Sequence, residues 1–295
     1  MERSEGLHNR SPGEDSEPGR LGAEDAPEAA TTARRFGQRF WPLFLLGLAG
    51  IAVLPFFLVP MLRVHTPQLP PGAPAFSLSA WVALSLVNPL LLLTAAVAIG
   101  AALAPKLGFR SHVAEYGFGR QTFARLRGEW REAALIGIVV SLLLVGLDAL
   151  LQPMLGPAWT KAVARLNRES SLFGEFASGL FYGGLTEELM LRWGVLSAVT
   201  WVLWRVMRTG RQLPSSGVVL AAVAVSGIVF GLGHLPAGAA IAPLTPMLVL
   251  RIIFFNAAAG IAYGLLYWRR SLEAAMVAHA STHVGFALLR LAGLA

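Results

Sequence analysis

Seven apolar segments, most of them twenty residues or longer, dominate this chain of 295 residues. A helix needs about 20 apolar residues to span the hydrocarbon core of a bilayer. Backbone N–H and C=O groups have no water partner there, so such segments fold as helices. The predicted spans are 40–62, 78–104, 132–152, 171–203, 215–235, 245–268 and 272–292. We therefore predict an all-α, polytopic helical membrane protein with about seven transmembrane helices.

Composition supports a membrane protein and narrows its partners. Hydrophobic residues make up 55% of the chain and charged residues 14%, whereas soluble domains are about 25% charged. The formal net charge is +7. A basic membrane protein usually owes its charge to loops that face anionic lipid. We expect the lipid bilayer as a partner and no nucleic acid.

The first 33 residues differ from the rest of the chain. They are rich in Pro, Gly, Ser, Glu and Ala and have almost no large apolar side chain. Such a composition cannot bury enough apolar surface to fold. We predict that residues 1–33 form a disordered, acidic cytoplasmic tail.

The positions of Lys and Arg predict the orientation of the spans, because cytoplasmic loops carry the excess of these residues. A cytoplasmic N-terminus leaves five cations on the opposite side, namely Arg63, Lys161, Arg165, Arg168 and Arg290. It places fourteen in the cytoplasm, namely Arg34, Arg35, Arg39, Lys106, Arg110, Arg120, Arg125, Arg127, Arg131, Arg205, Arg208, Arg211, Arg269 and Arg270. We predict an integral membrane protein with its N-terminus inside.

Three charged residues lie in the middle of the fourth apolar segment: Glu187, Glu188 and Arg192. On the translocon scale a charge at the bilayer centre costs about 2.5–3.5 kcal/mol, so such residues usually mark function. In an α-helix Glu188 and Arg192 lie on one side and can form an ion pair. Glu187 is turned about 100° away and stays free for chemistry. The alternative is a buried salt-bridge network that only fixes helix packing.

Three histidines also lie in apolar segments. His234 ends the fifth segment, and the i, i+4 spacing of His279 and His283 places both on one face of the last segment. Imidazoles and carboxylates in an apolar surrounding can bind a metal ion or activate a water molecule. The structural alternatives are an interfacial histidine at a helix end and polar contacts between helices. With no cysteine in the chain, any metal site must use His and carboxylate.

These residues resemble a known family. Residues 187–192, EELMLR, match the EExxxR signature of the CPBP intramembrane proteases, the family of CAAX prenyl endopeptidases and bacteriocin-processing or immunity proteins. Residues 230–234, FGLGH, match its FxxxH motif, and residues 279–283, HASTH, stand where the family has HxxxN or a variant. The resemblance covers roughly residues 170–292. It implies a protease core at 170–295, preceded by transmembrane helices and a basic cytoplasmic loop at 34–169.

The resemblance implies an endopeptidase that hydrolyses a peptide bond with a water molecule activated by glutamate. Glu187 is then the base and His234 its partner. His279 and His283 are the oxyanion donors, and Glu188 with Arg192 supports the site. The expected substrate is a peptide or protein, prenylated or otherwise membrane-associated, and the expected location is the inner membrane of a bacterium. This mechanism requires no cofactor.

Two alternatives to this mechanism stay open. His283 stands where asparagine is commoner in the family, and an imidazole can also bind metal. The first alternative is therefore a zinc ion held by Glu187, His234, His279 and His283. A different class of function is a catalytically inactive scaffold or immunity protein, or a proton-coupled transporter in which the same residues form a relay. The HExxH pattern of zincin-type sites does not occur in the chain.

Overall fold

A computed structural model of the chain describes residues 25–64, 76–169, 171–207 and 212–294. The chain forms two units, Met1–Arg35 and Phe36–Ala295. Within the described residues every regular element is a helix, and seven are long and apolar enough to cross a membrane. The prediction of an all-α, polytopic membrane protein with seven spans is confirmed. The chain is an integral membrane protein.

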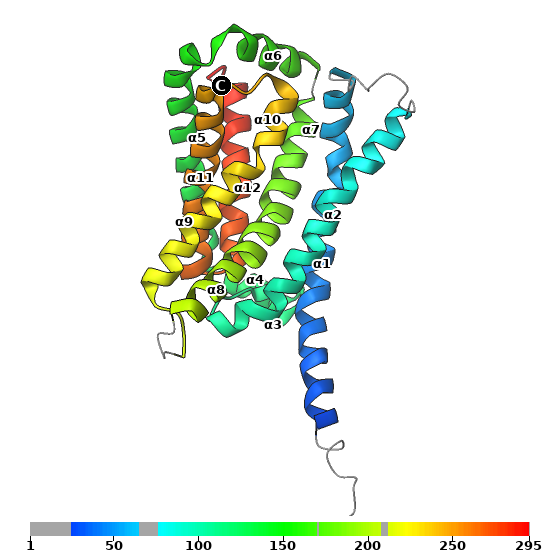
Figure 1. Cartoon of the computed structure of the whole chain (residues 1–295), viewed down its shortest axis with the longest axis vertical. Helices are drawn as coiled ribbons and strands as arrows, with labels where there is room; N and C mark the ends of the chain where they lie inside the picture. The colour runs from blue at the N-terminus through cyan, green and yellow to red at the C-terminus, as the bar shows by residue number, and fades with distance from the viewer. Residues whose placement is uncertain (1–24, 65–75, 170, 208–211, 295) are drawn as a thin grey trace, which may run out of the picture. The chain divides into compact units, whose positions relative to one another are not determined.

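The first three spans are close to the predicted segments. The elements that build them are α1 (Asp25–Val64), α2 (Leu78–Leu103) with η1 (Ala104–Leu107), and α5 (Trp130–Leu151) with η2 (Gln152–Met154). Two short helices, α3 (His112–Tyr116) and α4 (Arg120–Leu126), connect the second span to the third. A helix rich in cations, α6 (Gly156–Glu169), follows the third span. It lies at the end of the bundle opposite to α3 and α4 (Figure 1).

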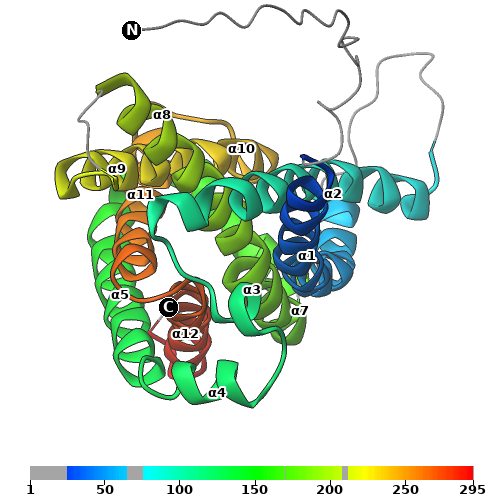
Figure 2. The ribbon, with the colours of Figure 1, turned by 90° about the horizontal axis from the view of Figure 1, so that it is seen from below.

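The last four spans carry the candidate site residues. The fourth consists of α7 (Leu172–Ala177), η3 (Ser178–Glu187), η4 (Leu189–Leu196) and α8 (Ser197–Met207). The fifth consists of α9 (Ser216–Gly233) and α10 (Leu235–Ile241), and the last two are α11 (Pro246–Arg269) and α12 (Leu272–Leu291). Helix α12 packs against both α5 and η3, and viewed along the bundle it lies between α5 and the fourth span (Figure 2).

The middle of the fourth span is a π-helix rather than the expected α-helix. Both η3 and η4 are π-helical, with Glu188 between them. Such i→i+5 turns are rare and often occur at functional sites. Glycines along this stretch allow close approach of other helices. A Cβ atom on Gly184 would lie 2.9 Å from Cβ of Ala280 in α12, and one on Gly194 would lie 2.5 Å from Cβ of Ala96 in α2.

The fifth span extends beyond its predicted end at residue 235. Helix α9 ends at Gly233, but α10 continues the span to Ile241. Pro236 lies in the first turn of α10, where its missing N–H leaves no hydrogen bond unmade. His234 therefore lies inside the span instead of at its end. This corrects the predicted end of the fifth segment at residue 235.

Helix α1 begins at Asp25, inside the segment 1–33 that was predicted to be disordered. Alanines favour helix in this stretch, and Pro27 falls in the first turn, where proline is tolerated. The rest of the predicted tail, residues 1–24, lies outside the described residues.

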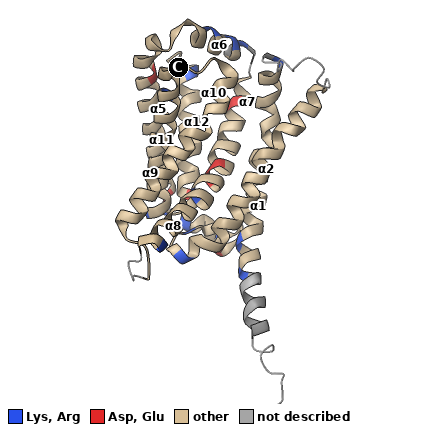
Figure 3. Cartoon of the chain, viewed as in Figure 1, with Lys and Arg blue, Asp and Glu red and all other residues tan. Residues whose placement is uncertain are grey.

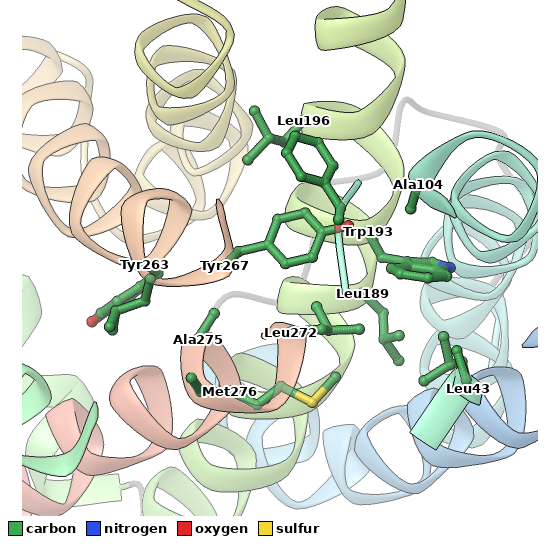
Figure 4. Packing of buried hydrophobic residues seen from close by; sticks show 14 of the residues in the cluster. Leu43, Ala104, Leu189, Trp193, Leu196, Tyr263, Tyr267, Leu272, Ala275 and Met276 are labelled. Carbon is green, nitrogen blue, oxygen red and sulfur yellow. The ribbon is translucent and has the colours of Figure 1, made fainter. Parts of the chain in front are cut away.

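The buried core of the second unit joins its first spans to its last. Trp193 and Leu189 of η4, Tyr267 of α11, Leu272 of α12 and Leu43 of α1 all belong to one apolar cluster (Figure 4). Packing also crosses the predicted boundary between residues 169 and 170, because α5 lies against α12 and α2 against η4. Lys and Arg lie mostly at the two ends of the helices, whose middle is largely uncharged (Figure 3).

Candidate active site

Glu187, His234 and His279 converge from three different spans. Glu187 ends η3, His234 follows the last residue of α9, and His279 lies in α12. Oε1 of Glu187 is 3.9 Å from Nε2 of His234, and Oε2 of Glu187 is 3.9 Å from Nε2 of His279. The Glu187 side chain is 16% exposed. The carboxylate thus lies between two imidazole nitrogens, too far from either for a direct hydrogen bond.

A backbone carbonyl determines the orientation of His234. Nδ1 of this residue lies 2.9 Å from the carbonyl oxygen of Phe230. A carbonyl can only accept, so Nδ1 donates and a neutral ring presents the lone pair of Nε2 to Glu187. The Phe230 ring also packs edge-on against His234, with 4.6 Å between the ring centroids. Phe230 therefore positions His234 by both its backbone and its side chain.

Glu188 has a different environment from its neighbour. Its side chain is 0% exposed, and its Oε1 atom lies 3.1 Å from Nη1 of Arg192 and 2.7 Å from Nδ1 of His279. The predicted Glu188–Arg192 pair is present, and His279 joins it. Because a carboxylate only accepts, Nδ1 of His279 donates to Glu188, which turns Nε2 toward Glu187.

Arg192 connects the fourth span to the helices around it. Its Nη2 atom donates to the carbonyl oxygen of Gly260 at 3.0 Å. The guanidinium also lies over two aromatic rings, 5.0 Å from the centroid of Phe230 and 5.3 Å from that of Tyr263. Cation–π contacts of this kind stabilise a buried charge. These contacts make Arg192 a structural support of the site.

His283 lies beside the converging trio and not within it. Its ring stacks on that of His279, with 5.2 Å between the centroids. Gly179 and Gly183 make room for it, since a Cβ on Gly183 would lie 2.8 Å from Nε2 of His283. Within the described residues the structure gives His283 no hydrogen bond or ion pair. The ring still lines the same cavity as Glu187.

One cavity of about 650 Å³ is lined by Glu187, His234, His279 and His283. This volume is within the range of small-molecule and cofactor sites. Most of its wall is apolar, with contributions from Leu54, Phe57, Leu144, Val145 and Phe286. Polar groups therefore converge at one part of an otherwise hydrophobic chamber.

Tyr263 is a site residue that sequence reasoning missed. Its ring stacks on His279 at 4.8 Å between centroids, and its hydroxyl hydrogen-bonds with Oγ1 of Thr282 at 2.7 Å. The i, i+4 spacing of Asn256, Gly260 and Gly264 in the same segment is typical of close helix packing. Nothing in it distinguishes a tyrosine beside a site histidine from one in an ordinary core.

The predicted zinc ligands do not form a recognisable metal site. Among the described residues, no group of three or more His, Asp or Glu side chains is placed to hold a metal ion. The residues as placed do not fit a zinc ion.

A comparison with known protein families finds one match. Residues 169–285 match the family model described as Type II CAAX prenyl endopeptidase Rce1-like. This part of the chain is similar to that family. The match confirms the resemblance to CPBP proteases and includes all three motifs. No curated protein and no solved structure matches the chain.

Proposed function

We propose that this Rce1-like protein is an intramembrane endopeptidase that hydrolyses a peptide bond with water activated by Glu187. One observation supports the proposal most strongly: a carboxylate from the fourth span faces the Nε2 atoms of two histidines from two other spans, inside a largely apolar cavity. Separations of 3.9 Å are suited to bridging by a water molecule rather than to direct bonding. The matched family supports protease activity.

In this mechanism Glu187 takes a proton from the water as its oxygen attacks the carbonyl carbon of the scissile bond. His234 accepts the second hydrogen bond of that water through Nε2, which orients the oxygen for attack. The proton on Glu187 then passes to the amine that leaves as the C–N bond breaks. The new carboxyl group thus has one oxygen from the peptide carbonyl and one from the water, and the proton from Glu187 completes the new amino terminus.

The oxyanion of the tetrahedral intermediate needs hydrogen-bond donors. His283 supplies the N–H of a neutral imidazole from the wall of the cavity. In a neutral His279 the single N–H is on Nδ1 and is donated to Glu188, so its Nε2 atom faces the cavity as an acceptor. Glu188 thus acts through His279 as a positioning residue.

We further propose a membrane-associated peptide, prenylated near its C-terminus, as the substrate. The description of the matched family names prenyl endopeptidases. An isoprenoid is apolar, and the cavity wall formed by Leu54, Phe57, Leu144 and Phe286 is suited to it. The membrane would deliver such a substrate by lateral diffusion.

The test is cleavage of a farnesylated C-a-a-X peptide by the purified full chain in liposomes. Glu187→Gln removes the base but keeps the shape of the side chain, so kcat should fall by about 10²–10⁴-fold. The control is Glu132→Gln. This carboxylate pairs with Arg270 and is 47% exposed, outside the cavity. It should keep the activity of the wild type.

Full activity of Glu187→Gln would refute the mechanism. Equal cleavage of the farnesylated peptide and of the same peptide without its isoprenoid would refute the proposed substrate class but leave the mechanism standing. A folded wild type that cleaves neither peptide would favour the scaffold role.

A further inference from the structure

We propose that a second cavity in this protein binds the phosphate group of a membrane lipid. The cavity has a volume of about 290 Å³ and shares no lining residue with the candidate active site. Its wall combines residues of α1, of η1 and the loop that follows it, of α3 and of η4. These elements meet at the end of the bundle where the second span ends, at Leu107.

Two arginines contribute positive charge to this cavity. Arg39 comes from α1 and Arg110 from the loop that follows η1. The structure shows no ion pair or side-chain hydrogen bond for either guanidinium within the described residues. The backbone at Arg110 is held in place, since its carbonyl oxygen accepts from the N–H of Leu272 at 3.0 Å. Arginine is well suited to phosphate because its fork of donors matches the phosphate oxygens.

The indole of Trp193 supplies an independent indication of a ligand. This side chain is 1% exposed, and its Nε1 atom has no hydrogen-bond partner. A buried donor without a partner costs about 1–3 kcal/mol, so native structures seldom leave one. Trp193 also lines the cavity. An oxygen atom of a bound phosphate can accept from this N–H while the arginines neutralise its charge.

The position of the Trp193 ring is well determined by its neighbours. A Cβ on Gly100 of α2 would lie 2.1 Å from Cδ1 of the indole, so only glycine allows the ring to lie there. On another side the ring contacts Tyr267, with 6.4 Å between the centroids. Figure 4 shows the indole nitrogen on the side of the ring that faces away from Tyr267. The donor is thus held in a fixed place without being used by the core.

The remaining polar groups of the cavity favour a phosphodiester. Oγ of Ser111 is already committed, since it donates to Glu273 and accepts from the N–H of Ala114. Glu115 is exposed at the cavity and reduces its net positive charge to about one. A phosphodiester carries a single negative charge, as in a glycerophospholipid. A lipid is the favoured source because the cavity lies where the second span ends, at headgroup level.

The test measures the thermal stability of the full chain in neutral detergent with added phosphatidylglycerol. A ligand that binds only the folded state raises Tm, by roughly 5–10 °C at about a hundred times its Kd. Diacylglycerol, which has the same acyl chains and no phosphate, is the lipid control. Inorganic phosphate is the third addition and distinguishes a free anion from a headgroup.

Two variants report on the site. Arg39→Gln/Arg110→Gln should abolish the shift in Tm caused by phosphatidylglycerol. Trp193→Phe keeps an aromatic ring but removes the donor together with part of the ring volume, so the shift in Tm should become smaller. Arg127→Gln is the matched control, because Arg127 is an exposed arginine near α4 that does not line the cavity. It should respond to lipid like the wild type.

The proposal would be overturned if phosphatidylglycerol raised the Tm of Arg39→Gln/Arg110→Gln as much as that of the wild type. It would also be overturned if Arg127→Gln lost the shift in Tm to the same extent as the double variant. Either result would show only general attraction of lipid to a basic surface. An equal shift with diacylglycerol would also overturn it. A shift with inorganic phosphate that disappears in Arg39→Gln/Arg110→Gln would support the phosphate site and overturn the assignment to a lipid.

Discussion

Glu187 and Glu188 are adjacent in sequence but have different surroundings. Glu187 faces two imidazoles at 3.9 Å inside the cavity, and Glu188 is fully buried between Arg192 and His279. A carboxylate that is partly exposed and not directly bonded can take up and release a proton during a reaction. A buried carboxylate whose Oε1 atom contacts both a guanidinium and an imidazole holds these neighbours in place. This difference predicts that substitution of Glu187 affects mainly cleavage, whereas substitution of Glu188 affects mainly the stability of the fold.

Glu188→Ala should destabilise the protein by about 3–5 kcal/mol, because it leaves the buried Arg192 without its counter-charge. Glu187→Ala should abolish cleavage and leave Tm close to that of the wild type. The measurement is thermal unfolding and folded yield in detergent, with cleavage assayed in parallel. Equal Tm values for the two variants would show that Glu188 is not the structural member of the pair.

The role of His283 can be tested by restoring the residue that is commoner in the family. If His283 donates to the oxyanion, His283→Asn keeps a donor and should retain activity to within about tenfold, whereas His283→Ala should lose about 10²–10³-fold. If His283 were a zinc ligand, His283→Asn would lose both metal and activity, since asparagine is a poor ligand for zinc. Elemental analysis of the wild type and of His283→Asn accompanies the assay.

We expect activity to be retained in His283→Asn and no stoichiometric zinc in either protein. A wild type that contains zinc, together with an inactive and metal-free His283→Asn, would overturn this expectation and support a metal mechanism.

At the scale of residues, the sequence predicted the Glu188–Arg192 pair but not the contacts that join the site residues of different helices. Charges in an apolar run require partners, so the pairing of Glu188 with Arg192 could be inferred from their spacing. The bond from His279 to Glu188 joins residues 91 positions apart, and no local pattern encodes it. The place of Tyr263 against His279 depends on the packing of α11 on α12 in the same way.

At the scale of elements, the start of α12 is joined to the short helices at one end of the bundle. Glu273 accepts from Oγ of Ser111 and from the N–H groups of His112 and Val113. Glu129 accepts from Ser271 and hydrogen-bonds with His112 at 3.3 Å. These two carboxylates hold α3 and the start of α5 to α12. His112 and Glu129 lie outside the membrane-spanning segments, whereas Glu273 lies in the first turn of the last one.

The His112–Glu129 pair predicts a pH-dependent stability. The hydrogen bond with Glu129 raises the pKa of His112 above its ordinary value of 6.5, although burial acts in the opposite direction. Burial tends to raise the pKa of Glu129, but the hydrogen bonds from His112 and Ser271 outweigh it and lower that pKa below 4.5. The His112 contribution is complete below pH 6.5 and is lost as pH rises through the raised pKa. The Glu129 contribution is present above pH 4.5 and is lost as pH falls through the lowered pKa.

Tm should therefore decline as pH is raised above 6.5 and through the raised pKa of His112, because His112 loses its charge in the folded state. His112→Gln should weaken this decline, since glutamine does not titrate. The measurement is thermal unfolding of wild type and His112→Gln at a series of pH values. Glu115 and Glu273 also act on His112, so Glu115→Gln should weaken the decline less than His112→Gln. An identical decline in wild type and His112→Gln would contradict this account.

The elements themselves were predictable to different degrees. Hydropathy was sufficient to count the seven spans, because a span must be about 20 apolar residues long. It did not reveal the π-helix, in which glycines of η3 and η4 lie close to other helices. The continuation of the fifth span through α10 was also missed. The predicted segment ended at residue 235, whereas Pro236 occupies the first turn of α10, where proline is tolerated.

At the scale of the whole molecule, the acidic N-terminal segment and the membrane bundle differ in composition. Eight of the seventeen acidic residues lie in the first 30 positions, namely Glu2, Glu5, Glu14, Asp15, Glu17, Glu24, Asp25 and Glu28. The residues proposed for catalysis, and the family match at 169–285, all lie far downstream of this segment. The proposed chemistry therefore needs nothing from the first 33 residues.

Removal of residues 1–33 should leave peptide cleavage unchanged, because a segment with so few apolar side chains adds no buried surface to the site. Limited proteolysis of the full chain should give a stable product that begins near residue 33. Its kcat and KM in liposomes are then compared with those of the intact protein.

A matched deletion of residues 1–24 keeps the whole of α1, which begins at Asp25, and separates an effect of the tail from an effect of a shortened helix. Loss of cleavage in both deletions would show that the acidic segment recruits substrate or orders part of the site. Loss only in the longer one would assign the effect to the first turns of α1.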